Sequence, residues 1–151
     1  MTVRIQTAPF DAQAEADALR SGDRDVGAVV TFVGTVRDVN DGDAVTTLEL
    51  EHYPGMTEKA LEAIEAEARK RFDVRGIAIV HRVGKLAPGD PIVLVAVTSA
   101  HRGAAFDACR FVMDYLKTRA PFWKKERTPQ GERWVEARAA DDDAAATWSP
   151  R

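Results

Sequence analysis

Residues 101–126, HRGAAFDACRFVMDYLKTRAPFWKKE, form the stretch that decides how the rest of the chain can be arranged. Apolar side chains recur in it at spacings of three and four, at Phe106, Cys109, Val112, Met113 and Leu116. This spacing predicts an amphipathic helix whose apolar face packs on a sheet. Pro121 follows Ala120 and stops the helix, because proline cannot continue it. The sequence therefore predicts one anchored, rigid helix with cationic groups at both ends.

The two cationic ends are too far apart to hold one small molecule within one chain. Arg102 and Lys117 are roughly 22 Å apart along the helix, at about 1.5 Å per residue. Either they serve different sites, or a second copy of the chain brings its Arg102 to the Lys117 of the first. Both alternatives are open at this point.

Composition limits the classes of protein that the chain can belong to. With 151 residues, 45% of them hydrophobic and 30% charged, the chain can bury a core as one ordinary folded domain. A net charge of only −3 argues against a general nucleic-acid-binding protein. We find no apolar run that could span a bilayer and no signal-peptide pattern in MTVRIQTAPF. We therefore expect a cytoplasmic protein that binds neither membrane nor nucleic acid.

Helix and strand patterns alternate along the chain in an order typical of the α+β class. We expect strands at 3–5, 26–37, 45–53, 76–82, 92–100 and 132–137, and helices at 11–20, 57–72 and 102–120. Turn signals between neighbouring strands favour a mixed or mostly antiparallel sheet in a single domain, 1–138, followed by an acidic tail, 139–151. The strands at 26–37 and 92–100 are apolar on both faces and should be buried, and Thr57 should cap its helix.

Two segments leave alternatives open. The polar loop at 38–44 lies beside Arg37, where it could be a mobile lid or a plain hairpin connection. The tail reads as a frayed helix or as disorder, with Trp148 able to dock on a neighbouring surface.

Cationic side chains at the ends of elements are the candidates for binding and catalysis. They are Arg37, His101, Arg102, Lys117, Lys124, Lys125 and Arg138. Arg102 and the first amides of its helix should form an anion site, since helix N-termini offer free N–H groups and arginine binds phosphate or carboxylate. Lys117 and Lys124 flank the helix end, where further cations and aromatic rings would favour a lysine acting as a base or nucleophile.

Metal and thiol chemistry find little support in the sequence. Cys109, the only cysteine, lies on the apolar face of the helix and should be structural. The histidines lack metal-ligand spacing, so we expect no metal and no resident cofactor.

Six motifs together resemble the large, catalytic subunit of molybdopterin synthase, the MoaE family. They are FVGTVR (32–37), LELEHYPGM (48–56), HRVGKL (81–86), VTSAHRGAAFDA (97–108), YLKTRAPFWKKE (115–126) and GERWVEAR (131–138). The resemblance covers nearly the whole chain in the same order, and the 97–108 and 115–126 motifs are its most specific parts.

The resemblance implies an α/β-hammerhead fold and a sulfurtransferase of molybdenum cofactor synthesis. Such enzymes convert cyclic pyranopterin monophosphate into molybdopterin. The two sulfurs come from the thiocarboxylated Gly-Gly terminus of a small ubiquitin-like subunit. The family assembly is a homodimer of large subunits within a heterotetramer.

Site residues carried over from the family fall into two groups. Lys117 and Lys124 are expected to be catalytic. The expected substrate-binding residues are Arg37, His101, Arg102, Lys125, Glu126, Arg138, Phe32 and Met113. The family pocket lies at the dimer interface, which would solve the distance problem: one chain supplies Lys117, Lys124 and Arg37, and the other supplies His101, Arg102 and Arg138.

Two other classes of function remain as alternatives. The chain could be a non-catalytic adaptor whose groove holds the Gly-Gly tail of a ubiquitin-like protein. The basic and aromatic segment 117–127 could bind single-stranded RNA, although the acidic overall balance opposes this.

Overall fold

Two four-stranded sheets, a short two-stranded hairpin and the helices that cover one of the larger sheets make up the described part of the molecule. The computed structural model describes residues 3–40, 43–44, 46–135 and 139–148. In chain order its elements are β1 (Val3–Gln6), α1 (Ala12–Arg20), β2 (Ala28–Thr35), β3 (Val39–Asn40), β4 (Asp43–Ala44), β5 (Thr47–His52), α2 (Met56–Arg71), β6 (Gly76–Arg82), β7 (Gly84–Leu86), β8 (Pro91–Ser99), α3 (Arg102–Arg119), β9 (Phe122–Thr128), β10 (Gly131–Trp134) and α4 (Ala139–Ala146).

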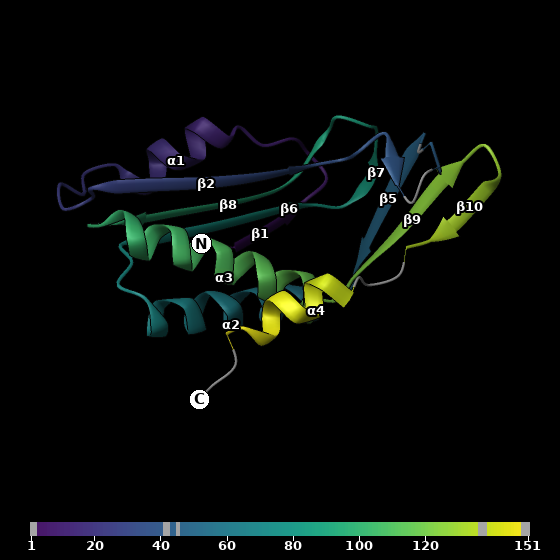
Figure 1. Cartoon of the computed structure of the whole chain (residues 1–151). Coiled ribbons are helices and arrows are strands. Elements are labelled where there is room, and N and C mark those ends of the chain that lie inside the picture. The colour runs from purple at the N-terminus through teal and green to yellow at the C-terminus, as the bar shows by residue number, and fades with distance from the viewer. Residues whose placement is uncertain (1–2, 41–42, 45, 136–138, 149–151) are drawn as a thin grey trace.

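The larger sheet has the strand order β1-β6-β8-β2, and the second has the order β10-β9-β5-β7. Only the β1–β6 pair is parallel among the described strand pairs. Figure 1 shows the two sheets beside each other, with α1 on one face of the larger sheet and α2 and α3 on the other. The predicted α+β class with a mixed sheet is confirmed, as is the central position of β8.

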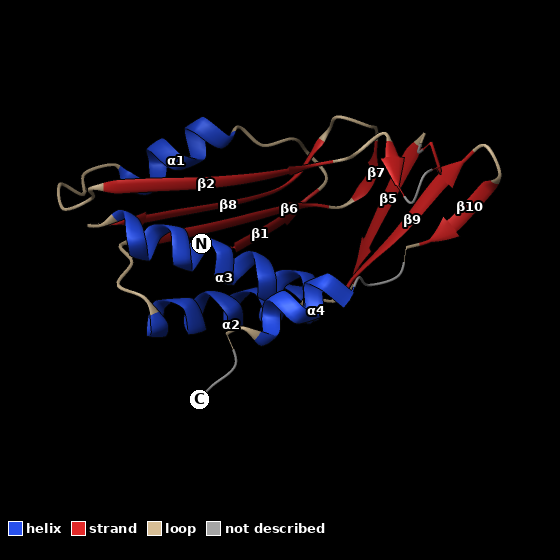
Figure 2. Cartoon of the chain, viewed as in Figure 1, coloured by secondary structure: helices blue, strands red, loops and turns tan. Residues whose placement is uncertain are grey.

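Strand alternation divides the side chains of the larger sheet between two apolar layers. One face packs against α2 and α3 and includes Ile77, Ile79, Val93, Val95 and Val97. The other face packs against α1 and its flanks and consists of Ala78, Val80, Leu94 and Ala96. Figure 2 shows that helices lie on both faces of this sheet.

Helix α3 lies on the sheet as expected, although its apolar face is rotated from the predicted one. Its buried residues are Ala105, Ala108, Cys109, Phe111, Val112, Met113, Tyr115 and Leu116. Phe106 is 60% exposed, so its assignment to the packed face was wrong. The small residues Ala105 and Ala108 take that place, which lets the helix approach the sheet closely.

Strand β2 is an edge strand rather than the buried strand that its composition predicted. It pairs with β8 alone among the described strands, and Val29, Phe32 and Val33 remain 38–39% exposed. Apolar residues do lie on both faces of β2, but in a single chain one of these faces has no covering layer among the described residues.

The start of α2 differs from the prediction and helps to position the second sheet. Gly55, not Thr57, is the N-cap residue, with a φ of 85° that favours glycine. Thr57 is fully buried inside the helix. Its hydroxyl accepts from the Tyr53 amide at 2.9 Å and donates to the Pro121 carbonyl at 3.0 Å. Thr57 therefore fixes the backbone from which β9 begins, and β9 is a strand that the sequence reading missed, as is β7.

The segment after Arg37 contains a short hairpin. Strands β3 and β4 pair through Val39 with Ala44 and Asn40 with Asp43. This arrangement favours the hairpin alternative for 38–44, and the lid role stays a prediction.

The acidic tail begins with helix α4, which packs on α3. Trp148 lies against the rings of Phe72 and Phe111, with centroids 5.6 and 5.7 Å away, and its Nε1 donates to Asp114 at 2.7 Å. Trp148 thus docks on its own chain. The domain boundary at 138 stays a prediction.

Candidate active site

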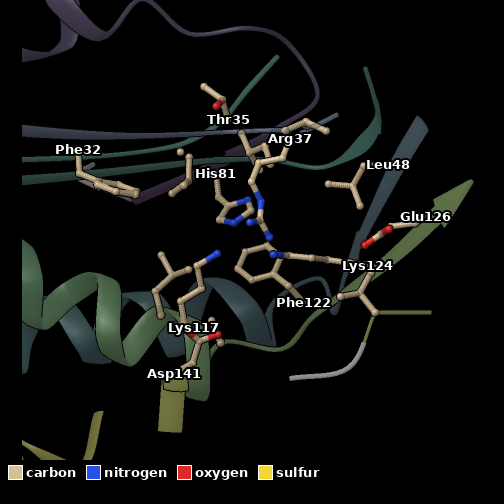
Figure 3. Close-up of a pocket in the computed structure, with 17 residues that line it drawn as sticks. Phe32, Thr35, Arg37, Leu48, His81, Lys117, Phe122, Lys124, Glu126 and Asp141 are labelled. Atoms are coloured by element: carbon tan, nitrogen blue, oxygen red, sulfur yellow. The ribbon is translucent and has the colours of Figure 1, made fainter. Parts of the chain in front are cut away.

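A cavity of about 400 Å³ opens where the two sheets meet the C-terminal end of α3. Its lining comes from β2, β5, β6, β8, α3, β9 and α4, which are far apart in the sequence. The lining residues are Phe32, Gly34, Thr35, Val36, Arg37, Leu48, His81, Ile92, Val93, Leu116, Lys117, Ala120, Phe122, Lys124, Glu126, Val135 and Asp141. Figure 3 shows cationic side chains from three directions pointing into this space.

The end of β2 brings Phe32 and Arg37 to the cavity. The pairing of β2 with β8 shifts register between Gly34 and Thr35, so the chain turns away from the sheet just before Arg37. A Cβ at Gly34 would lie 2.8 Å from Val93 Cγ1 and 3.4 Å from the Phe32 ring. Glycine at this position therefore keeps the strand close to β8 and leaves room for the Phe32 ring at the cavity wall.

The last turn of α3 and the first residues of β9 supply the two lysines. Lys117 precedes the helix end at Arg119, and the chain re-enters as β9 after Pro121. Alternation along β9 points Phe122, Lys124 and Glu126 to the same side, and all three line the cavity. The predicted grouping of Lys117, Lys124 and Arg37 within one chain is thus present in the structure.

Lys125 does not join this group, for the same reason of strand geometry. It lies on the opposite side of β9, where its Nζ pairs with Glu132 at 3.1 Å and lies 5.4 Å from the centroid of Trp134. The hydrogen bond with Glu132 raises the pKa of Lys125. In this chain Lys125 is therefore a surface residue engaged with β10 rather than part of the cavity.

The remaining predicted residues lie elsewhere. His101 and Arg102 are exposed at the N-terminal end of α3, far from the cavity along the 18-residue helix. Met113 is 9% exposed within the main core and does not line the cavity. Arg138 lies outside the described residues.

Two ionisable lining residues, His81 and Asp141, were not predicted as site residues. His81 is a histidine near a strand end without metal-ligand spacing, and Asp141 belongs to an acidic tail. His81 follows an apolar run in β6, and only the neighbouring sheet and β9 show that its ring faces a cavity. The HRVGKL motif, which begins at His81, was the one available hint.

Electrostatically the cavity suits an anionic ligand. Arg37, Lys117 and Lys124 donate hydrogen bonds and bring positive charge. Glu126 is only 3% exposed, and its carboxylate lies 3.4 Å from Arg133 Nη2. A phosphate placed among the three cations would meet donors from three separate elements.

Metal-binding clusters and membrane-spanning helices are both absent from the described ranges. No cluster of three or more His, Cys, Asp or Glu side chains there could bind a metal ion. No helix there combines the length and the apolar composition needed to cross a membrane.

Known proteins show the same fold and much of the same sequence. A molybdopterin synthase catalytic subunit from Ralstonia nicotianae is 60% identical over 147 residues, which are 97% of this chain and 84% of that protein. The solved structure of the molybdopterin biosynthesis MoaE protein from Burkholderia ambifaria matches with a TM-score of 0.84 and 61% identity, covering 97% of both chains. Molybdopterin synthase from Staphylococcus aureus matches with a TM-score of 0.81 and 34% identity, covering 87% of this chain and 95% of that one.

These matches confirm the predicted fold and the predicted resemblance. The family model described as MoaE protein matches residues 5–119, which include β2, all of α3 and therefore Arg37 and Lys117. Because this match spans most of the chain and relatives about 60% identical cover nearly all of it, the chain belongs to the MoaE protein family.

Proposed function

We propose that the protein is the catalytic subunit of a molybdopterin synthase, converting cyclic pyranopterin monophosphate into molybdopterin. The observation that carries this proposal is the meeting of Arg37, Lys117 and Lys124 at one cavity of about 400 Å³. That volume lies within the range typical of small-molecule sites. Three cations around it suit a phosphorylated substrate and an anionic sulfur donor.

The proposed reaction proceeds in two rounds. In each round the sulfur of a protein thiocarboxylate attacks a carbon of the pterin side chain, and a carbon–sulfur bond forms as a carbon–oxygen bond breaks. In one round the oxygen leaves as water, and in the other it stays on phosphorus as the cyclic ester opens. Water then hydrolyses the link between this sulfur and the acyl carbon, which leaves sulfur on the pterin and releases the carrier with a free carboxylate. A second loaded carrier repeats the sequence, so the enzyme acts as a sulfurtransferase.

Each cation has a proposed role in this sequence. Lys117, at the end of α3, transfers protons or forms a transient covalent link. Lys124 and Arg37 hold the phosphate and stabilise the negative charge that develops when the cyclic ester opens. Glu126 and Phe32 contribute to the substrate-binding wall.

The proposed sulfur carrier is a small ubiquitin-like subunit whose Gly-Gly terminus enters the cavity. The relatives are named as a catalytic subunit, a name that points to at least one further subunit. We place the reaction in the cytoplasm.

The proposed assembly is a homodimer with one carrier on each large subunit. The dimer accounts for His101 and Arg102, which do not line the cavity of their own chain described above. In this assembly they reach the pocket of the second copy, as does Arg138. The exposed apolar side of β2, next to Phe32, supports an interface in this region.

Incubation with cyclic pyranopterin monophosphate and a thiocarboxylated carrier tests the function. We expect molybdopterin to form, with two carriers consumed for each product. Binding of the carrier without binding of the pterin by the large subunit would instead support the adaptor function and overturn the proposal.

A further inference from the structure

His81 is the buried histidine of the cavity, and none of the roles above uses it. It lies near the end of β6, is 3% exposed and lines the cavity with Arg37 and Lys117. Figure 3 shows its imidazole in the interior of the site, with the ammonium group of Lys117 directed towards it. The burial of this polar imidazole ring inside the cavity needs an explanation.

Two contacts fix the orientation and the tautomer of this ring. Nδ1 lies 2.8 Å from the backbone carbonyl oxygen of Arg82. Since a carbonyl oxygen can only accept, Nδ1 carries the hydrogen and Nε2 keeps its lone pair. The ring also stacks on Phe122, with centroids 4.0 Å apart and planes inclined by 20°.

The surroundings keep the imidazole neutral. Burial, together with the positive charges of Lys117 and Lys124, lowers the pKa of His81 to about 3, while the hydrogen bond to the Arg82 carbonyl acts in the opposite direction. The ionisable groups that line the cavity or act on the ring come from five elements or their ends: Arg37, His52, Lys117, Lys124, Glu126 and Asp141. Near pH 7 the ring thus offers a lone pair without adding charge.

We propose that His81 contacts the substrate directly, with Nε2 accepting a hydrogen bond from an N–H or O–H group of the bound phosphorylated pterin. This inference rests on the proposed function, because it names a contact within the same cavity. Arginine and lysine side chains only donate, so they hold the phosphate but cannot receive the N–H groups of a pterin ring. His81 supplies a fixed, uncharged acceptor beside them, which orients the heterocycle relative to the phosphate.

Two variants with amide side chains separate the role of Nε2 as a hydrogen-bond acceptor from the packing of the ring. In His81→Gln the longer side chain can place an amide oxygen where Nε2 was. In His81→Asn the amide nitrogen can keep the bond to the Arg82 carbonyl, but no acceptor reaches the cavity. We expect the dissociation constant for cyclic pyranopterin monophosphate to rise about tenfold in the asparagine variant and to stay within about threefold of wild type in the glutamine variant.

Calorimetric titration of the full assembly with this pterin measures both constants, and the melting temperature of each variant reports the cost in packing. Equal weakening by the two variants would mean that His81 only supports Phe122, and would overturn the inference. Unchanged binding by His81→Asn would also overturn it. A wild-type protein that neither binds nor converts the pterin would instead overturn the proposed function.

Nitrogen-15 NMR of imidazole-labelled wild-type protein gives a readout independent of variants. We expect an unprotonated Nε2 and a protonated Nδ1 from pH 5 to pH 8, with the Nε2 resonance moving when the pterin is added. A protonated Nε2, or a resonance that the saturating pterin leaves in place, would contradict the proposed contact.

Discussion

The two ends of α3 are both cationic, yet they differ in what surrounds them. At the C-terminal end, Lys117 meets β2, β6 and β9, and the lining includes the buried residues His81 and Glu126. At the N-terminal end, His101 and Arg102 are exposed, and the helix lacks a side-chain cap and an acidic residue in its first turn. One end is therefore a cavity formed by several elements, and the other is an exposed cationic helix terminus that would need a partner surface to become a site.

The largest expected effect is at the C-terminal end. Lys117→Ala should lower the rate of molybdopterin formation at least about a hundredfold, because a positioned proton-transfer group contributes 10²–10⁴-fold. Carrier binding and the dimer should persist. Single-turnover assays measure the rate. The matched control is Arg110→Ala, which removes an exposed cation from the same helix, and normal turnover by the Lys117 variant would refute its assigned role.

A mixed dimer tests whether the two ends meet across copies of the chain. The Arg102→Ala variant should lose activity only if the guanidinium group of Arg102 contributes to a pocket of the dimer. In a mixture of Lys117→Ala and Arg102→Ala chains, about half of the dimers combine both, and each of these has one intact pocket. Activity should therefore return to about a quarter of wild type. No return above the two separate variants would place both residues in one chain's site, or in different sites.

The tail should stabilise the C-terminal end of α3 through Trp148. Trp148→Ala removes the ring packed on Phe72 and Phe111 and the hydrogen bond to Asp114. We expect the free energy of unfolding to fall by about 2–4 kcal/mol. Urea denaturation measures this change. Trp123→Ala is the control, since Trp123 is 47% exposed and its removal should cost about 1 kcal/mol or less. Equal losses in the two variants would contradict the docking of the tail.

Acid should destabilise the C-terminal end through His81. The pKa of this buried ring is about 3 in the folded chain, against 6.5 for a free histidine. The unfolded state therefore binds about one proton more between these values, and the free energy of unfolding falls as the pH drops from about 6.5 towards 3. Denaturation at a series of pH values should show this slope in wild type and a shallower slope in His81→Gln. Equal slopes in the two proteins would contradict a buried, neutral His81 ring.

The smallest effect is expected at Cys109, in the middle of α3. Burial raises the pKa of its thiol to about 11, so the thiol stays protonated at pH 8 and alkylation of the folded protein should be slow. Reaction should accelerate when urea unfolds the chain. Cys109→Ala should retain turnover close to wild type. Rapid labelling of the native protein, or loss of turnover, would revive a role for this thiol.

The sequence predicted the elements whose patterns are local. Helix α3, its end before Pro121 and the strand β6 follow from apolar spacing and proline alone. Arg37, Lys117 and Lys124 were candidates because they lie at element ends, and their grouping in one chain was implied by the resemblance to the MoaE family. His81 and Asp141 could not be found in this way, because a residue in an apolar strand and one in an acidic tail carry no local sign of a cavity.

The predictions that were wrong failed for the same reason, because the local sequence carries no sign of the tertiary surroundings. The composition of β2 predicted burial on both faces, but the strand lies at a sheet edge, where Phe32 stays 39% exposed. The run of charged residues at 124–127 concealed the strand pattern of β9, whose alternation sends Lys124 and Glu126 to the cavity and Lys125 to the surface. Adjacent lysines look equivalent in a sequence, and only the pleat of a paired strand separates them.

The chain by itself thus determined the periodic elements, the family and the supply of cations. Tertiary structure alone decided that His81 and Asp141 line the cavity and that Lys125 does not, since that depends on how β6, β9 and α4 pack together. The spacing of apolar residues is set within a few neighbouring positions. The gathering of cations at one cavity depends instead on contacts between residues far apart in the sequence, such as those that bring Lys117 and Lys124 to Arg37.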